Sequence, residues 1–394
     1  KGGQLMNKDI EALNDDIKNY PEVFPITEDM NMTFSGISRL IMLDRYAFKD
    51  TDKSHLRVGD TVVTTIKDDP TYPTRGIGKI VELVNDVASI EVEDEYASVL
   101  TDDNRIIKRL NQIDKPLELF YEQIAHRVAK GIANSATVGN KEDLEHKFYY
   151  QLIKQNFIPA GRVLYGSGTN SEVTYFNCYV MPFVHDSRAG IAHHREKIME
   201  IMSRGGGVGT NGSTLRPKDA TVHGVNGKSS GAVSWLNDLA NLTHLVEQGG
   251  SRRGAQMIML DDWHPDIYEF IISKIQNPYV LRHLIKTTKD NYLKTLARDK
   301  LNYKKLSPAK LNLYKKIVND VEDKNLRQEI QAQIDDGGKY TVKDSDFLTG
   351  ANISVCLTND FMEAVETDST YDLRFPDVSS YLQHHLRFFY KDLV

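Results

Sequence analysis

The sequence is poor in cysteine, in long apolar runs and in excess positive charge, and each shortage excludes a class of protein. Only Cys178 and Cys356 occur among 394 residues, so we expect no secreted disulfide scaffold and a cytoplasmic location. No apolar run approaches the roughly 18–20 residues of a membrane-spanning helix, so no membrane partner is expected. The net charge of -6 argues against a nucleic-acid coat protein. Any anion site must therefore come from a local cluster of basic residues.

Changes in residue pattern predict three regions. Residues 1–54 mix helical and loop signals, and residues 55–102 contain short, alternating, β-branched segments separated by Asp, Pro and Gly. The second pattern predicts a small β-barrel of the SH3-like kind, for which partner binding and a purely structural role are both open. Residues 115–394 form the largest predicted region, and 40% hydrophobic content is enough for a sizeable core.

Within the largest region, the pattern alternates between helices and strands. Helical spacing of apolar residues predicts helices in 116–135, 141–157 and 233–247. A buried strand is predicted around Cys178, followed by a helix whose N-cap is Asp186 or Ser187 and whose end is the GGGVG run at 205–209. Strands are also expected within 215–225 and 256–260, and a strand followed by a helix within 350–366.

The segment 280–342 differs from its surroundings because it is rich in Lys, Asp and Asn, with regularly spaced leucines. Ser307 and Pro308 form a favourable N-cap and N1 pair, and the DDGG run at 335–338 is a helix stop. The pattern predicts a helical insertion on the surface.

Three glycine-rich turns lie close together in the sequence. They are SRGGGVGTNGS, HGVNGKSSG and EQGGSRRGA, and basic residues stand in and between them: Arg204, Arg216, Lys218, Arg252 and Arg253. Glycine lets backbone amides approach an anion closely, and the arginine fork matches the geometry of phosphate. Their combination predicts phosphate binding.

Several more specific motifs are excluded or weak. The GKS run at 227–229 is not a Walker motif, because Val222 stands where glycine is required. Gly207, Gly209 and Gly212 have dinucleotide-fingerprint spacing but follow a helix instead of a strand. The histidine pairs at 193–194 and 384–385 lack the spacing of a helical metal site, so no metal site is predicted.

Five motifs in order carry a family resemblance. They are FNCYVMPFVHDSRAGI, MSRGGGVGTNGSTLRPKDATVHG, NGKSSGAVSW, EQGGSRRGAQMIMLDDWHPDIYEFI and GANISVCLTNDFMEAV. The sequence resembles the first half of a ribonucleotide reductase large chain. Its motifs are most similar to those of class II, the adenosylcobalamin-dependent type. The resemblance covers roughly 145–280 and 348–365, and leaves out 1–115 and 280–342.

The resemblance implies an α/β fold, a ten-stranded barrel of two five-stranded halves, of which this chain holds the first. It implies that a thiyl radical on a finger loop removes the ribose 3′ hydrogen of a ribonucleotide, while two other cysteines reduce the 2′ position. By motif, Cys178 matches the reducing cysteine of the first strand. Asn177, Gly206 and Gly207 match the substrate pocket. Adenosylcobalamin would act at the assembled active site.

The resemblance also implies allosteric control by a deoxynucleoside triphosphate effector. The residues matching the effector site are Asp186, Ser187, Arg216 and Lys218. The loop that would carry effector identity to the substrate consists of Gly249, Gly250, Ser251, Arg252, Arg253 and Gly254. Such a loop needs glycine to change shape and arginine to contact nucleotides.

The sequence departs from the family at the radical cysteine. The finger loop should read N-x-C-x-E, but Ser354 and Thr358 flank Cys356, and Phe176 and Val180 flank Cys178. We therefore expect the N-terminal subunit of a split enzyme that acts as a dimer. A C-terminal half subunit would supply the radical cysteine, and a dithiol such as thioredoxin would be the reductant. A truncated chain, a class I large chain and a non-catalytic nucleotide-sensing module are the alternatives.

Overall fold

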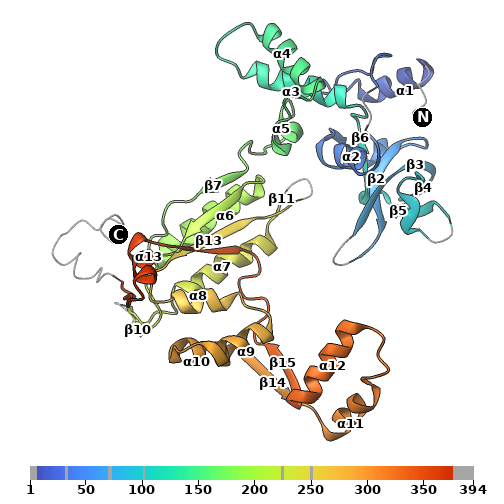
Figure 1. The fold of residues 1–394 in the computed structure, drawn as a ribbon. Helices are drawn as coiled ribbons and strands as arrows, with labels where there is room; N and C mark the ends of the chain where they lie inside the picture. Colours follow the sequence, from blue (N-terminus) through green and yellow to red (C-terminus); the bar gives the residue numbers. More distant parts are fainter. Residues whose placement is uncertain are drawn as a thin grey trace. The chain divides into compact units, whose positions relative to one another are not determined.

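The computed structural model describes residues 7–31, 34–69, 73–100, 103–222, 226–248 and 252–375, without the side chains of 7–9, 247–248 and 252–253. The chain divides into two compact units, Lys1–Asn177 and Cys178–Val394 (Figure 1). Across the described ranges, every helix falls short of the length and apolarity that crossing a bilayer requires.

In the first unit, some helices precede the strands in the sequence and the others follow them. They are α1 (Asn7–Ile17), α2 (Gly36–Ile41), a π-helix (Met42–Tyr46), α3 (Tyr121–Asn134), α4 (Lys141–Ile153) and α5 (Gly161–Gly166). The helices predicted within 116–135 and 141–157 are confirmed as α3 and α4, which pack against each other. Apolar residues on α3, including Ile124 and Val128, are fully buried, as the helical spacing predicts.

The sheet of the first unit has six antiparallel strands in the order β1-β6-β2-β3-β4-β5. Its strands are β1 (Lys49–Asp50), β2 (Thr61–Lys67), β3 (Thr74–Val84), β4 (Val87–Val92), β5 (Arg105–Arg109) and β6 (Ile113–Pro116). Strands β2 to β5 form a meander, and β6 returns to β2 after a single 3-10 turn at Leu110–Gln112. The strand-rich region therefore runs from Lys49 to Pro116, with β1 and β5 as the outer strands of the described sheet.

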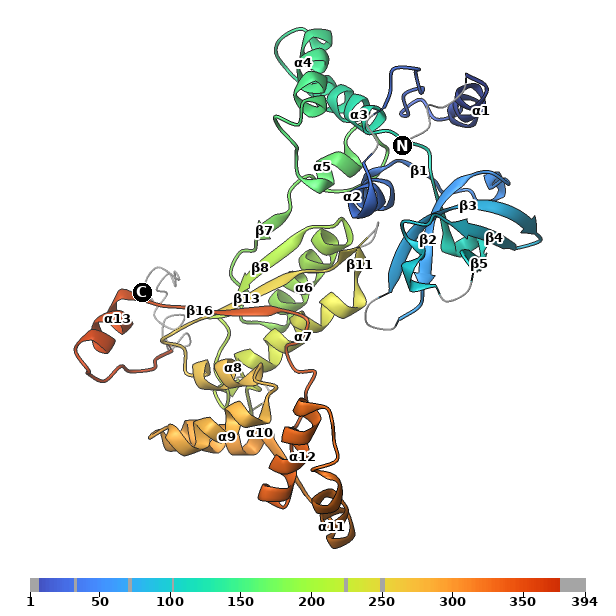
Figure 2. The same ribbon diagram turned by 45° about the vertical axis from the view of Figure 1, so that its right-hand side comes forward.

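The core of the second unit is a parallel sheet with the order β16-β13-β8-β7. Its strands are β7 (Cys178–Val180), β8 (Gly207–Asn211), β13 (Gln256–Asp261) and β16 (Asn352–Cys356). Helices α6 (Arg188–Ser203) and α7 (Ala232–Leu245) cover one face of this sheet, and α8 (Ile267–Ser273) packs beside them (Figure 2). Ile198, Leu236, Ile258 and Phe270 are completely buried in this α/β core.

The strand around Cys178 exists, but the prediction that it is buried is wrong. Cys178 is exposed, and the side chain of Val180 is 91% exposed. The physical reason is that β7 is the outermost strand of the described sheet, with only β8 beside it. The strand β8 was not predicted, because its glycines suggested a turn.

Two short antiparallel strand pairs lie at two of the glycine-rich stretches of the sequence. One consists of β9 (Thr221–Val222) and β10 (Gly227–Lys228), and the other of β11 (Glu247–Gln248) and β12 (Arg252–Arg253). The helix predicted over 233–247 ends at Leu245 because the chain then enters β11.

The predicted insertion is helical but also contains a strand pair. Its elements are α9 (Pro278–Thr287), α10 (Asn291–Lys300), β14 (Leu301–Lys305), α11 (Pro308–Ile317), α12 (Lys324–Asp336) and β15 (Gly338–Val342). Strands β14 and β15 pair in antiparallel fashion. Ser307 caps α11 and Gly337 ends α12 at a φ of +67°, as the sequence predicts. The helix α13 (Asn359–Glu366) then follows β16.

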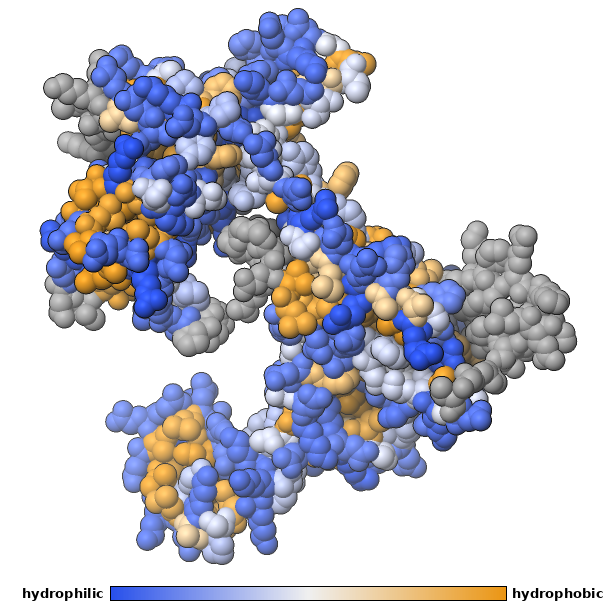
Figure 3. All heavy atoms as spheres, turned by 180° about the vertical axis from the view of Figure 1, so that it is seen from behind, coloured by the Kyte–Doolittle hydropathy of each residue, from blue (hydrophilic) through white to orange (hydrophobic). Residues whose placement is uncertain are grey.

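Apolar side chains reach the surface of both units. Figure 3 shows apolar surface on the insertion and on the six-stranded sheet. Leu313 and Leu326 are 53% and 48% exposed on the insertion, and Ile107 is 74% exposed on β5.

Candidate functional site

Strand register brings Cys178 and the glycine-rich strand together. Cys178 pairs with Gly207 across the β7–β8 ladder, so the two residues are direct neighbours. A Cβ on the preceding Gly206 would lie 2.5 Å from Cγ2 of Ile201 and 2.8 Å from the Tyr179 ring. Packing therefore requires glycine at 206, and the backbone runs close beside β7. Asn177 precedes Cys178 in the chain and is exposed.

One face of the parallel sheet carries the candidate chemistry. Paired residues of parallel strands project to the same side, so the register places Cys178, Gly207, Met257, Ser354 and Cys356 on one face. This face is called the open face below, because the helices α6 and α7 cover the other one.

The open face contains polar contacts between neighbouring strands. Asn211 Nδ2 donates to Asp261 Oδ1 at 3.0 Å, and Ser354 Oγ lies 3.2 Å from Met257 Sδ. Parallel sheets are ordinarily covered on both faces. The open face thus carries polar side chains where the covered face carries the apolar core.

The two cysteines lie far apart on the open face. Cys178 begins β7 and Cys356 ends β16, and β8 and β13 separate their strands. Three strand spacings alone amount to about 14 Å, well beyond the Cα separation of a disulfide. Both cysteines are free thiols. This geometry excludes Cys356 as a direct disulfide partner of Cys178 in this fold.

Cys356 is also electrostatically unsuited to act as a nucleophile. Burial and the neighbouring Asp261 carboxylate raise the pKa of its thiol to about 11, so it stays protonated at neutral pH.

The predicted effector residues meet at the start of α6. Arg216 Nε donates to Asp186 Oδ2 at 2.7 Å, and the same guanidinium reaches the backbone carbonyl of Asp186 at 3.3 Å. Ser187 is the N-cap of α6, because its Oγ accepts from the Gly190 backbone N–H at 3.0 Å. Sequence reasoning left Asp186 and Ser187 as alternatives for this cap, and the structure selects Ser187. The cluster thus combines an arginine with the positive end of a helix, a favourable setting for phosphate.

Lys218 is held in a different way from Arg216. Its backbone N–H lies 3.1 Å from both carboxylate oxygens of Asp266, and its Nζ lies 3.6 Å from Glu269 Oε2. Burial raises the pKa of Glu269, and the Lys218 ammonium opposes that shift. The Lys218 ammonium therefore lies next to Glu269 on α8.

A buried clamp fixes the turn that carries Arg216 and Lys218. The carboxylate of Asp266 accepts a hydrogen bond from the Lys218 backbone N–H. It also accepts one, at 2.9 Å, from the backbone N–H of Ala232, the first residue of α7. His264 Nε2 donates to the Leu215 carbonyl at 2.8 Å, while its Nδ1 accepts from the Asp266 backbone N–H at 3.0 Å. Burial lowers the pKa of His264, which favours the neutral ring that this arrangement requires.

Sequence reasoning assigned no role to this clamp. Its signal is the WHPD run at 263–266, which brings a histidine and an aspartate together directly after a predicted strand. The three backbone segments that the clamp joins are distant in sequence, so only the structure identifies its partners.

The predicted specificity loop is only partly described. Gly249, Gly250 and Ser251 lie outside the described residues, and Arg252 and Arg253 form β12. The backbone of β12 pairs in antiparallel fashion with that of β11. Gly254 follows it, where a Cβ would lie 3.0 Å from Met202 Sδ on α6. The base of this strand pair is therefore packed against the C-terminal end of α6, the end opposite Ser187.

The described part of the chain was also compared with the side-chain arrangements that bind metal ions. Within those ranges, no group of three His, Cys, Asp or Glu side chains is placed to hold a metal ion. His194, one of the paired histidines, is buried on α6, and its Nε2 lies 3.1 Å from Thr210 Oγ1.

Comparisons with known proteins agree with the resemblance in the sequence. The model of the ribonucleotide reductase barrel domain matches residues 176–394, and that of the ribonucleotide reductase all-alpha domain matches residues 94–172. A vitamin B12-dependent ribonucleoside-diphosphate reductase of Thermoplasma acidophilum is 28% identical over 279 residues, covering 67% of this chain and 34% of the relative.

Two further relatives differ in the type of reductase that their names give. A vitamin B12-dependent ribonucleoside-diphosphate reductase of Mycobacterium tuberculosis is 33% identical over 166 residues, covering 42% of this chain and 24% of the relative. A ribonucleoside-diphosphate reductase large subunit of Caenorhabditis elegans is 30% identical over 164 residues, covering 41% of this chain and 20% of the relative. The chain spans about a third or less of the length of these relatives. Because the barrel-domain model matches more than half of its residues, the chain belongs to the ribonucleotide reductase family.

Proposed function

We propose that this chain contributes the first half of the barrel of a reductase that converts ribonucleotides to deoxyribonucleotides. The observation that carries the proposal is the pairing of Cys178 with Gly207 at the edge of a parallel sheet. This pairing places a free, exposed thiol beside the glycine backbone that the family resemblance assigns to the substrate. Asn177 and Gly206 complete the proposed substrate-contacting group. The phosphate count of the substrate is left open.

In this proposal Cys178 is one of two reducing thiols. Two thiols together give two hydrogen equivalents to the substrate, the 2′ hydroxyl leaves as water, and the thiols end as a disulfide. Cys356 is too distant to be the second thiol, so that thiol must come from a complementary polypeptide segment. The radical cysteine is assigned to the same segment, because neither Cys178 nor Cys356 has the N-x-C-x-E context.

The open face supports a half-barrel. Four parallel strands are described, and β7 and β16 are their outer members. In a barrel both outer strands acquire neighbours, and the open face becomes an enclosed interior. Completion of the sheet to five strands, and of the barrel to ten, is therefore proposed. The split between two subunits, the SH3-like character of the small sheet and the boundaries of the three regions stay predictions.

Adenosylcobalamin is proposed as the radical source of the assembled enzyme, with the class I type as the alternative. Two of the relatives named above carry a vitamin B12-dependent name and one does not. In the described chain Cys178 is exposed, so these residues alone do not enclose a cofactor next to it. Cobalamin binding by the assembled complex, measured against each half alone, tests the class II assignment.

The cluster at the start of α6 is proposed as the effector site for a deoxynucleoside triphosphate. Asp186, Ser187 and Arg216 lie together there, and Lys218 is held nearby through Asp266. The strand pair β11–β12 is proposed to transmit the identity of the effector, through Gly249 to Gly254. Gly254 packs against Met202 near the C-terminal end of α6, so the link to the cluster would run along this helix. A dimeric assembly, a thioredoxin-like reductant and a cytoplasmic location remain expectations.

Reconstitution tests the whole proposal. The chain is mixed with a complementary segment that carries N-x-C-x-E, a ribonucleotide, a dithiol and adenosylcobalamin, and deoxyribonucleotide is measured by chromatography. Product that requires both segments supports the proposal. Effector binding without any product, in a mixture whose complementary segment forms the radical, favours the nucleotide-sensing alternative instead.

A further inference from the structure

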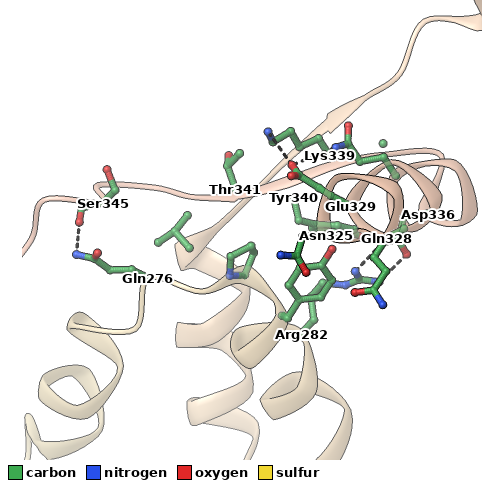
Figure 4. A pocket seen from close by; sticks show the side chains of 16 residues that line it. Gln276, Arg282, Asn325, Gln328, Glu329, Asp336, Lys339, Tyr340, Thr341 and Ser345 are labelled. Carbon is green, nitrogen blue, oxygen red and sulfur yellow. Dashed lines mark hydrogen bonds and ion pairs between the residues drawn. The ribbon is translucent and has the colours of Figure 1, made fainter. Parts of the chain in front are cut away.

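Two arrangements of polar and charged side chains in the second unit lie outside the residues of the proposed function. In the insertion, Arg282 forms a two-point ion pair with Asp336 at the wall of a hollow, and these side chains are 22% and 23% exposed (Figure 4). At the clamp, in contrast, His264 and Asp266 are only 0% and 6% exposed. Because a buried polar group costs free energy unless its hydrogen bonds are made, the clamp is the more demanding arrangement.

Asp266 does not serve the helix that it begins. It is the N-cap of α8, a position from which an aspartate ordinarily accepts a hydrogen bond from an N–H of its own helix. Its side chain makes no such bond, and its carboxylate accepts instead from the backbone N–H of Lys218 at 3.1 Å and from that of Ala232 at 2.9 Å. The carboxylate is closely surrounded, because a Cβ on Gly231 would lie 2.9 Å from Asp266 Oδ2. Its hydrogen bonds therefore go to the turn and to α7.

His264 holds the other end of the same turn. Its Nδ1 accepts from the Asp266 backbone N–H at 3.0 Å, so the ring hydrogen is on Nε2. Nε2 therefore donates to the Leu215 carbonyl at 2.8 Å. The Phe375 ring packs against the imidazole in a T-shaped contact, with the ring centroids 5.5 Å apart. These contacts fix the position of the His264 ring.

The clamp thus fixes the backbone on both sides of Arg216. Leu215 is held through its carbonyl and Lys218 through its N–H, and between them Pro217 has a φ angle restricted by its own ring. A proline also restricts the backbone of the residue before it, which is Arg216. The clamp therefore sets the direction in which the Arg216 side chain leaves the backbone to reach Asp186 at 2.7 Å.

We propose that His264 and Asp266 are positioning residues of the effector site. They hold the guanidinium of Arg216 at the start of α6, where it meets the phosphates of a deoxynucleoside triphosphate. In this role neither side chain contacts the nucleotide. The role rests on the proposed function, since it requires an effector that binds at Arg216. When the turn places Arg216 correctly for only a fraction of the time, the affinity falls by that fraction.

Calorimetry of the full chain with dATP, dGTP, dCTP and dTTP, each titrated in turn, tests this role. His264→Met removes the donor to Leu215 and should weaken effector binding by about tenfold, the loss expected when the turn is correctly placed about one tenth of the time. His264→Gln is nearly isosteric with that variant, but its amide can still donate and accept, so it should retain most of the affinity. A thermal melt followed by circular dichroism checks that each variant is folded.

A double-mutant cycle separates positioning from a general loosening of the fold. In an Arg216→Ala background, His264→Met should cause no further loss of affinity, because the group that the clamp positions is gone. His194→Met is the matched control. It removes another buried histidine of the same unit, whose Nε2 lies 3.1 Å from Thr210 Oγ1 on β8, and it should leave effector affinity unchanged.

The outcomes distinguish the positioning role from the effector site itself. The role is overturned if folded His264→Met binds like the wild type or loses as much affinity in the Arg216→Ala background as in the wild type. It is also overturned if His264→Gln or His194→Met loses as much affinity as His264→Met. No binding by the wild type, or unchanged binding by Arg216→Ala, would overturn the effector site of the proposed function and this role with it. Binding that requires Arg216 but not His264 would remove the role alone.

Discussion

Arg216 and Asp186 form an ion pair at 2.7 Å beside the N-terminus of α6. The pair neutralises the arginine that the resemblance assigns to effector phosphate, so a bound triphosphate must share or replace Asp186 as its partner. The cap residue Ser187 and the following helix amides remain on the same side of the cluster. A deoxynucleoside triphosphate that binds here, as proposed, would therefore compete with Asp186 for this guanidinium.

The first prediction follows from this competition. Arg216→Ala should weaken deoxynucleoside triphosphate binding by about tenfold to a hundredfold, the range for losing a charge-assisted hydrogen bond. Calorimetry with each deoxynucleotide measures the change. Arg204→Ala is the matched control, because Arg204 lies at the far end of α6 and pairs with Glu200. Equal losses in both variants, or no loss in Arg216→Ala, would contradict the assignment of the site.

The second prediction concerns the clamp at Asp266. Asp266→Ala leaves the backbone N–H groups of Lys218 and Ala232 without their acceptor, and should lower the free energy of unfolding by about 2–4 kcal/mol. Trp235 and Trp263 both lie in the second unit, so tryptophan fluorescence during urea unfolding reports on it. Asp266→Asn retains one acceptor oxygen and should recover part of the loss. A variant as stable as the wild type would show that the clamp contributes nothing.

The third prediction concerns the first unit. The side chains of Arg127 and Glu118 are 1% and 0% exposed, and two N–O contacts of 2.7 and 2.9 Å join them. Arg127→Met leaves a buried carboxylate without its cation, which should cost about 3–5 kcal/mol. Circular dichroism should then show helix melting at a lower temperature than in the wild type. A melting temperature equal to that of the wild type would contradict this contribution of the Arg127–Glu118 pair.

The fourth prediction is a loss of stability in acid. Burial lowers the pKa of His264 below its ordinary value of 6.5, so the unfolded chain binds its proton first as the pH falls. The contribution of this residue is therefore complete above pH 6.5 and is lost progressively below it, by at most about 1.4 kcal/mol per pH unit. Unfolding in urea at several pH values, followed by tryptophan fluorescence, measures the slope.

A matched variant isolates this histidine. His194 in the same unit also has a pKa lowered by burial, so it adds to the slope in the wild type. His264→Gln should therefore reduce the slope below pH 6.5 without abolishing it. An unchanged slope in this variant would assign the acid sensitivity to other groups.

The sequence is most informative where local chemistry decides the structure. Ser187 and Ser307 cap helices, and Gly337 ends one. These helix ends are predictable because each depends on only a few neighbouring residues. The parallel strands with branched apolar residues are predictable for the same reason. The glycine-rich strand β8 is not, since glycine disfavours strands by propensity and only its pairing with β7 and β13 explains it.

The arrangement of the site requires the fold. The motif resemblance identifies Cys178, Gly207 and Arg216 as site residues. It does not predict that Cys178 is exposed or that Asp186 forms an ion pair with Arg216. These are long-range relationships that depend on strand order and on which strand lies outermost. The clamp of His264 and Asp266 is a stronger example, because its partners at Leu215 and Ala232 are joined only by tertiary packing.

The last prediction separates the two cysteines. In the reconstituted complex, Cys178→Ser should abolish deoxyribonucleotide formation, because a hydroxyl can neither supply the reducing hydrogen nor close a disulfide. Radical formation on the complementary segment should survive, since it uses a different cysteine, and electron paramagnetic resonance can follow it. Cys356→Ser should leave turnover largely intact, at a packing cost of about 0.5–3 kcal/mol, because its thiol is protonated and lies near the other end of the sheet. Normal turnover by Cys178→Ser would remove the proposed reducing role, and an inactive but folded Cys356→Ser would transfer that role to Cys356.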